Sequence, residues 1–167
     1  MKHNLEFLYQ TQWLSDINDS SKHPMLRFYK IFKQFFQQEQ YIELIADREI
    51  QKSISKFRLS SHCLRIHTGR HERDKHNKNT PANQRFCLSC KSGEIDDELH
   101  LLLKCKTHDL ERRNFFAIIS SHIQLETSST STPIELLNLI INSDNKKVLF
   151  ELGRFLKIAF NKRKSEN

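Results

Sequence analysis

Three cysteines and one histidine near the middle of the chain have the residue types and the spacing of a metal site. They follow the pattern Cys-x2-Cys-x9-His-x4-Cys, with Cys87, Cys90, His100 and Cys105 as the four ligands. Zinc prefers four nitrogen or sulfur donors in a tetrahedron, and four protein ligands leave no open position for a substrate. The pattern therefore predicts one Zn²⁺ ion in a structural role and no catalytic metal.

These four ligands need a tight turn followed by a helix. The segment 86–95 is short and has Gly93 near its middle, which predicts a small turn or hairpin that presents the first two cysteines. Asp96 is expected to cap the helix that carries His100. Two residues five positions apart do not share a face of an α-helix, so the helix must end or distort near Cys105.

Other interpretations of these residues remain open. The Cys-x2-Cys pair could be a redox pair, although no βαβ unit surrounds it, or the cysteines could be unrelated core thiols. His67, His71 and His76 could hold a second metal, but such residues are also common in solvated basic loops. The acidic run 96–98 could bind a divalent cation, although capping of the helix start is the simpler expectation.

A remaining cysteine, Cys63, lies between His62 and His67 in a stretch that is similar to the end of a zinc finger. No Cys-x2-Cys pair lies at the required distance upstream. We therefore expect Cys63 to lie outside the metal site.

The positive charge of the chain is concentrated in one quarter of it. The net charge is +7 over 167 residues, and segment 51–91 has ten Lys or Arg against Glu72 and Asp74, a local charge of +8. Such a segment suggests contact with the phosphates of DNA or RNA, with little base specificity, or simply a solvated basic loop. The residues that we expect to contact phosphates are Arg58, Arg65, Arg70, Arg73, Lys75, Lys78 and Arg85.

The rest of the chain predicts a mainly α fold of about seven helices with a small zinc-knuckle turn or hairpin. Few Gly and Pro residues interrupt it, and Phe, Leu and Ile recur at three- and four-residue spacing. This spacing predicts a first helix over 5–17, a second over 25–36, a stretch over 41–59 with a possible break near Asp47, and a last helix with a buried stripe over 148–159. Thr132-Pro-Ile-Glu135 has the pattern of a capping box, and Ser143-Asp144 is expected to cap the last helix. Three parts are expected: N-terminal helices over 1–58, a basic loop and zinc-binding segment over 59–126, and C-terminal helices over 127–167. They are expected to pack as one compact domain, with a Ser/Thr linker at 127–132 and a frayed tail at 162–167.

Several classes of function are disfavoured by the sequence. No run of eighteen apolar residues and no signal-peptide pattern occurs, so we expect no membrane partner and an intracellular location, nuclear or cytoplasmic. No Gly-rich phosphate loop and no Gly-x-Ser-x-Gly turn occurs, so we expect neither an enzyme nor a small-molecule substrate.

The zinc segment resembles a region near the C-terminus of the reverse transcriptases of non-LTR (LINE-type) retrotransposons. The resemblance covers about residues 41–116 and includes Ser55-Lys-Phe-Arg-Leu-Ser-Ser-His62, Gly69-Arg-His71, the four ligands and Arg112-Arg113. It implies the same zinc ligands and a role in gripping template RNA or target DNA. The chain has neither a Tyr/Phe-x-Asp-Asp pair nor the carboxylates of an RNase H, so no polymerase activity is implied.

Two functions from different classes follow. The leading one is a non-enzymatic, zinc-binding, nucleic-acid-binding module derived from a retroelement reverse transcriptase. The alternative is a structural or protein–protein interaction remnant that zinc staples together and that has no role with nucleic acid.

Overall fold

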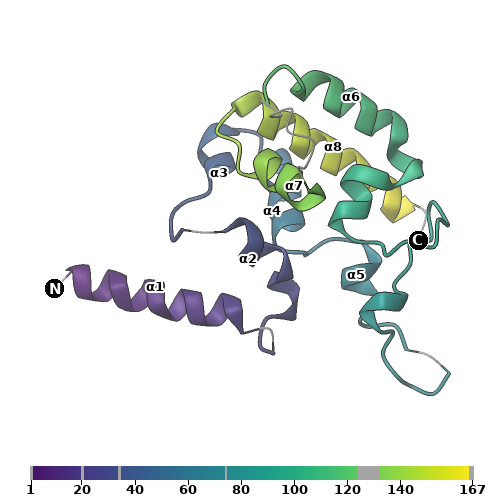
Figure 1. Ribbon diagram of the computed structural model, residues 1–167, viewed down its shortest axis with the longest axis horizontal. Coiled ribbons are helices and arrows are strands. Elements are labelled where there is room, and N and C mark those ends of the chain that lie inside the picture. The colour runs from purple at the N-terminus through teal and green to yellow at the C-terminus, as the bar shows by residue number, and fades with distance from the viewer. Residues whose placement is uncertain (1, 20, 34, 74, 124–131, 166–167) are drawn as a thin grey trace.

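The computed structural model describes residues 2–19, 21–33, 35–73, 75–123 and 132–165, and these are mainly α-helical, as predicted (Figure 1). Within those ranges there is no strand, and the extended pairing consists of two isolated antiparallel bridges, Arg73–Asn79 and Phe86–Ile95. The α-helices are α1 (Lys2–Asn18), α2 (Tyr29–Phe32), α3 (Gln40–Leu44), α4 (Arg48–Arg58), α5 (Arg65–Thr68), α6 (Asp109–Ile119), α7 (Pro133–Ile141) and α8 (Lys146–Ser165). Short 3-10 turns cover Pro24–Arg27, Ala82–Gln84 and Lys106–His108, and a π-helical turn covers His100–Lys104.

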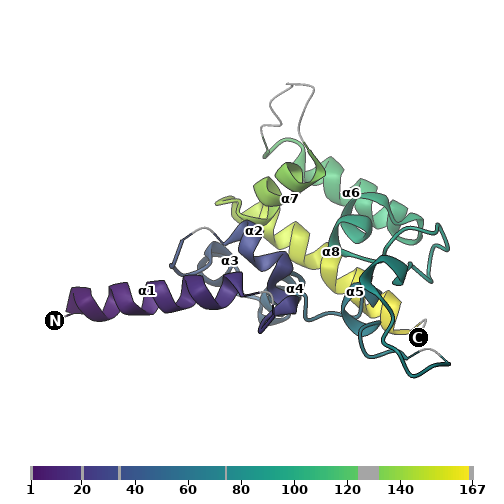
Figure 2. The same cartoon turned by 60° about the horizontal axis from the view of Figure 1, so that its bottom comes forward.

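The core is built around α8, against which α4, α6 and α7 pack (Figure 2). The predicted apolar stripe of α8 is buried, and Val148, Leu152 and Leu156 are completely inaccessible to solvent. Gly153 permits the close approach of α4, because a Cβ atom there would lie 2.3 Å from Cγ2 of Ile50. The C-terminal helices therefore share one core with the N-terminal half of the chain.

One of the expected helical stretches is shorter in the structure than its apolar spacing suggested, and another is divided where a break was predicted. The stripe over 25–36 forms a 3-10 turn and then α2, which ends at Phe32, and Phe35 and Phe36 beyond it are exposed. The stretch from Tyr41 to Leu59 breaks where expected. The carboxylate of Asp47 accepts hydrogen bonds from the backbone N–H groups of Glu49 and Ile50 and so caps α4.

Helix α1 lies along the edge of the body and extends well beyond it (Figures 1 and 2). It contacts the remainder through Trp13, whose ring meets the edge of Phe36 with centroids 5.5 Å apart. Several of its large apolar side chains are exposed, among them Phe7 (64%) and Tyr9 (67%). The predicted first helix is confirmed, but it adds little to the core.

The C-terminal helices begin and end at residues that differ in part from expectation. The predicted capping box of α7 is present, with reciprocal bonds between Thr132 and Glu135. At the start of α8, Asn145 rather than Asp144 accepts the backbone N–H groups of Lys147 and Val148. The expected Ser/Thr linker lies outside the described residues except for Thr132.

The tail over 162–167 was predicted to fray, and for residues 162–165 this prediction is wrong. Helix α8 continues to Ser165, and Arg163 is only 4% exposed because its guanidinium group makes buried ionic contacts. Among the described residues, no helix is both long enough and apolar enough to cross a membrane.

Candidate metal centre and basic loop

The four predicted metal ligands come together in the structure. The ligand atoms of Cys87, Cys90, His100 and Cys105 all lie within 4.8 Å of one another. Sγ of Cys87 is 3.9 Å from Sγ of Cys105, and Sγ of Cys90 is 3.3 Å from Nε2 of His100. Three of the four side chains are buried, and Cys90 is half-buried. Three sulfur donors and one imidazole nitrogen at these separations could hold one metal ion.

The first two ligands lie on the predicted hairpin. Phe86 and Ile95 form its antiparallel bridge, with the Cys87 N–H donating to the Glu94 carbonyl at 2.8 Å. Gly93 adopts a φ of +76°, a conformation that favours glycine and reverses the chain. The hairpin therefore holds Cys87 and Cys90 on one side of the cluster.

The last two ligands lie on a helical turn that is distorted in the way the spacing required. His100–Lys104 is π-helical, and the Cys105 N–H donates to the His100 carbonyl at 2.7 Å. A hydrogen bond across five residues widens the turn and brings positions i and i+5 toward the same side. The predicted distortion near Cys105 is thus confirmed, and its form is a π-turn.

A carboxylate orients the histidine ligand. Nδ1 of His100 lies 3.0 Å from Oε2 of Glu94, so that Nε2 faces the sulfur atoms. Carboxylate–histidine pairs of this kind fix the ring and its tautomer in metal sites. Glu94 is on the hairpin, and its role was not predicted from the sequence.

Hydrogen bonds within the cluster favour a thiolate at Cys105 and a protonated ring at His100. A hydrogen bond from Cys87 lowers the pKa of Cys105 to about 7, with a further contribution from Arg163. Burial disfavours the protonated form of His100, yet its hydrogen bonds with Cys87, Glu94 and Cys90 raise its pKa to about 9. A metal cation would supply the charge that a proton otherwise supplies here.

The acidic run 96–98 is structural, and one part of its expected role is corrected. Asp97, not Asp96, caps the turn, since its carboxylate accepts the His100 N–H at 2.8 Å. Asp96 instead accepts the Arg65 N–H at 2.9 Å and pairs with Arg163 at 3.1 Å, while its own N–H bonds within the hairpin.

The third member of this run, Glu98, is fully buried. It pairs with Arg27 at 2.7 Å and with His62 at 3.1 Å, and it accepts a hydrogen bond from Ser60. Burial opposes ionisation, but these partners lower the pKa of Glu98 to about 2. The carboxylate therefore serves as an ionic joint between the 3-10 turn before α2 and the metal segment.

The remaining thiol and the other histidines stay outside the metal cluster. Cys63 is half-buried, and its Sγ lies 3.8 Å from the Phe160 carbonyl. His67 and His71 have ring centroids 6.4 Å apart, and no second metal cluster that includes them occurs in the described part of the chain.

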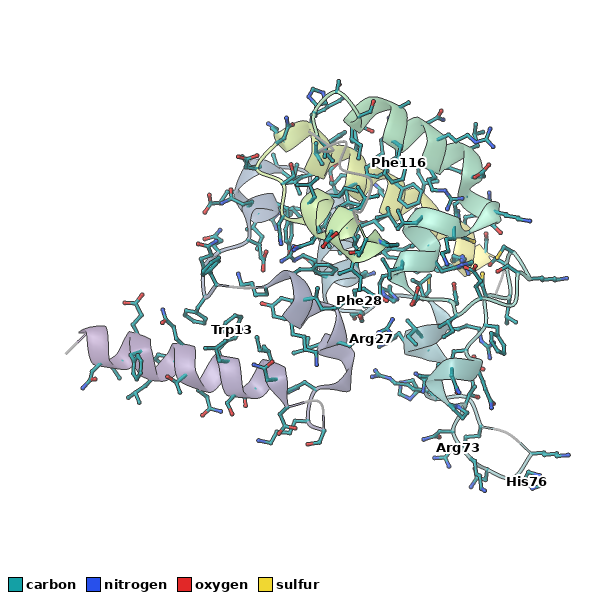
Figure 3. The ribbon with its side chains drawn as sticks, in the orientation of Figure 1. Trp13, Arg27, Phe28, Arg73, His76 and Phe116 are labelled. Carbon is teal, nitrogen blue, oxygen red and sulfur yellow. The ribbon has the colours of Figure 1, made fainter. Side chains whose placement is uncertain are left out.

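Most of the expected phosphate-contacting residues lie on or beside one projecting loop. This loop, here called the basic loop, covers about residues 71–80 and is closed by the bridge between Arg73 and Asn79. Arg73, Lys75 and Lys78 are exposed on it, and Figure 3 shows His76 at its far end and Arg73 nearer the helical body. Arg65, Arg70 and Arg85 are half-buried at the base of the loop. The base is fixed by Arg85, which donates to the carbonyls of Thr80 and Ile66 at 3.0 and 2.7 Å.

Arg58 must be removed from this set. It is 2% exposed, pairs with Glu39 at 2.6 Å and donates to the Ile141 carbonyl at 3.1 Å. A side chain so enclosed is out of reach of a phosphate backbone. Sequence alone did not reveal this, because Arg58 ends a helix within a basic segment and resembles its exposed neighbours.

Two comparisons of the sequence, with protein-family models and with curated proteins, and one of the structure with solved structures, found no match to this chain.

Proposed function

We propose that this chain is a non-enzymatic nucleic-acid-binding module, held in shape by one structural zinc ion and derived from a retroelement reverse transcriptase. The observation that carries the proposal is the connection between the metal cluster and the basic loop. Arg65 at the base of the loop donates its backbone N–H to Asp96, which follows the ligand hairpin directly. A metal that orders the hairpin would also order the support of the loop.

The donor set supports zinc among the metals that the cluster could hold. Three thiolates and one imidazole in a closed, buried group are typical of structural zinc sites. Magnesium and calcium prefer oxygen ligands, whereas the four ligand atoms here are three sulfurs and one nitrogen, and the Glu94 carboxylate is directed to the other nitrogen of the histidine ring. The arrangement provides four protein ligands and so leaves no open coordination position, which is typical of a structural rather than a catalytic site.

The loop supports nucleic acid as the partner. Its exposed cations project into solvent where a phosphate backbone can reach several of them together. Glu72 is engaged by Arg65. Arg73, Lys75 and Lys78 outnumber the other acidic residue of the loop, Asp74, so the loop keeps a positive charge. Such contacts depend on charge and give little discrimination between sequences.

Fluorescence anisotropy with a labelled single-stranded oligonucleotide over a range of salt concentrations tests this proposal. The affinity is expected to fall steeply with salt, and Arg73→Gln with Lys78→Gln should reduce the log–log slope by roughly 0.7 per charge removed. Lys52→Gln is the matched control, because Lys52 is exposed on α4 away from the loop. Affinity that does not fall with rising salt would contradict the proposal.

Helix α1 supports the alternative, a protein-interaction module. Leu5, Phe7, Leu8 and Tyr9 are each more than half exposed on a helix that extends past the body. Large apolar side chains that are exposed in such number often mark a protein interface. Concentration-dependent association in sedimentation experiments, together with no binding of nucleic acid, would favour this second function.

A further inference from the structure

A cavity of about 380 Å³ lies between the 3-10 turn before α2 and the base of the basic loop. Its polar wall consists of the side chains of Arg27, Arg70, Arg85, His67 and Ser60, and Ile66 and Ala82 form its apolar wall. Three arginines therefore border one cavity, and Arg27 comes from a segment more than forty positions before the other two.

Each of these arginines is held by contacts with the surrounding chain, and Arg70 donates from Nε to Nε2 of His71 at 3.0 Å. Arg85 uses Nε and Nη1 for the carbonyls of Thr80 and Ile66, and within the described residues no hydrogen bond of its Nη2 is found. Gly69 lets the Arg85 stem pack closely, because a Cβ atom at Gly69 would lie 3.0 Å from Cγ of Arg85. Arg27 is paired with Glu98 at 2.7 Å and with Asp97 at 3.8 Å, and neither carboxylate has an ion pair with Arg70 or Arg85 among the described residues.

The cations around the cavity repel one another. Burial and the charges of Arg70 and Arg27 lower the pKa of Arg85. Burial and Arg70 likewise lower the pKa of His67, to about 4. Positive charge is therefore in excess at this place, and the apolar wall reduces the screening of that charge by water.

We propose that this cavity binds a phosphate group. Guanidinium groups match phosphate through paired, charge-assisted hydrogen bonds, and three converging groups suit an anion with three or more oxygen atoms better than a two-oxygen carboxylate. The inference rests on the proposed function only for the source of the phosphate, which is either a nucleic-acid backbone or a free ion. With a nucleic acid, the cavity would fix one phosphate while the exposed loop follows the neighbouring ones.

Titration with inorganic phosphate, followed by NMR of the arginine side-chain and His67 signals, tests the cavity directly. Acetate at the same ionic strength is the control anion. We expect saturable shifts with phosphate and none with acetate. Arg70→Gln should weaken phosphate binding at least about tenfold, because it removes a charge-assisted hydrogen bond.

Two further variants separate the cavity from the general charge of the loop. Ala82→Phe fills the cavity without removing a charge and should abolish phosphate binding, while Lys75→Gln removes an exposed loop charge outside the cavity and should leave it unchanged. The far-UV circular dichroism of each variant reports whether it is folded. Absence of saturable shifts, equal binding of acetate, or unchanged phosphate binding in a folded Ala82→Phe variant would overturn the inference.

A short single-stranded oligonucleotide then identifies the source of the phosphate. If the nucleic acid uses the cavity, inorganic phosphate will compete with it and Ala82→Phe will weaken its binding. Phosphate binding without any oligonucleotide binding would support the cavity and overturn the proposed function. Oligonucleotide binding that is equal in wild type and Ala82→Phe, with no binding of inorganic phosphate, would overturn the cavity and leave the proposed function standing.

Discussion

The guanidinium group of Arg163 on α8 lies 3.2 Å from Sγ of Cys105, although the two residues are 58 positions apart. The same group pairs with Asp96 at 3.1 Å and donates to Nε2 of His108 at 3.2 Å. With a divalent cation bound, three thiolates and one imidazole would have a net negative charge, which this arginine would partly offset. The last helix is thereby tied to the metal segment.

Replacement of this arginine should weaken both the metal site and the fold. In Arg163→Leu, the buried Asp96 loses its ionic partner, which typically destabilises a protein by about 3–5 kcal/mol. Loss of an outer contact to a ligand typically lowers metal affinity 10–100-fold. Chelator competition and urea unfolding measure the two effects. Lys164→Gln, at an exposed position on the same helix, should change neither, and equal behaviour of the two variants would refute the role of Arg163.

The two classes of cysteine should respond differently to substitution by serine. Cys90→Ser should lose the metal and unfold at least residues 85–116, because the free energy of metal binding contributes directly to folding in such sites. Cys63→Ser should keep the metal, since Cys63 lies outside the cluster. Metal content and circular dichroism report on both variants. Native helicity and thermal stability in a metal-free Cys90→Ser variant would show that the site is not structural.

Arg58 should be important for stability and unimportant for the binding of nucleic acid. Its buried guanidinium group pairs with Glu39 and donates to the Ile141 carbonyl and to Asn142, at the C-terminus of α7. Arg58→Ala is expected to reduce the free energy of unfolding by about 1–3 kcal/mol, because the buried Ile141 carbonyl loses its donor and Glu39 keeps only Lys33 as an ionic partner.

The exposed Lys52 on the same helix provides the control, and Lys52→Ala should change stability by less than about 0.5 kcal/mol. For both variants, affinity for an oligonucleotide is to be measured under conditions where the protein is folded. If folded Arg58→Ala binds the oligonucleotide more weakly and Lys52→Ala does not, Arg58 contacts the nucleic acid and this prediction is wrong.

His67 should make the fold sensitive to acid. Burial, together with Arg70 and the neighbouring His62 and His71, lowers its pKa from 6.5 to about 4. The unfolded chain therefore takes up this proton more readily, and the contribution of neutral His67 to stability is present above about pH 6.5 and is lost as the pH falls toward about 4.

An NMR titration of the His67 ring tests this directly, with a midpoint near 4 expected. His67→Gln should make the free energy of unfolding depend less on pH in the same window, whereas His122→Gln, at an exposed position, should not. A midpoint for His67 near 6.5 would contradict the description of its surroundings.

The parts of the site that depend on local spacing were predictable, and those that depend on long-range packing were not. The ligand set, the hairpin and the distortion before Cys105 follow from residue types within twenty positions, and the structure brings these ligands together. The roles of Arg163 and Glu98 could not be read in this way, because their partners are distant in the sequence. Arg58 shows the converse error, since net charge along a segment does not distinguish a buried cation from an exposed one.

The ends of two helices could not be predicted from the sequence, because they depend on tertiary contacts. The stripe over 25–36 has helical spacing, but the chain leaves the helix after Phe32, and Lys33 pairs with Glu39 at 3.0 Å. The tail over 162–165 is rich in lysine and arginine, and it was therefore predicted to fray. In the structure, buried contacts of Arg163 hold it in α8, which continues to Ser165.

Metal content tests the central claim most directly. Native mass spectrometry of the purified protein, with and without a strong chelator and alongside circular dichroism, would count the ions and report the state of the fold. We expect one zinc ion per chain, and its removal should unfold at least the segment around the four ligands. A chain that is fully folded without any metal, and that gains no stability when zinc is added, would contradict the account.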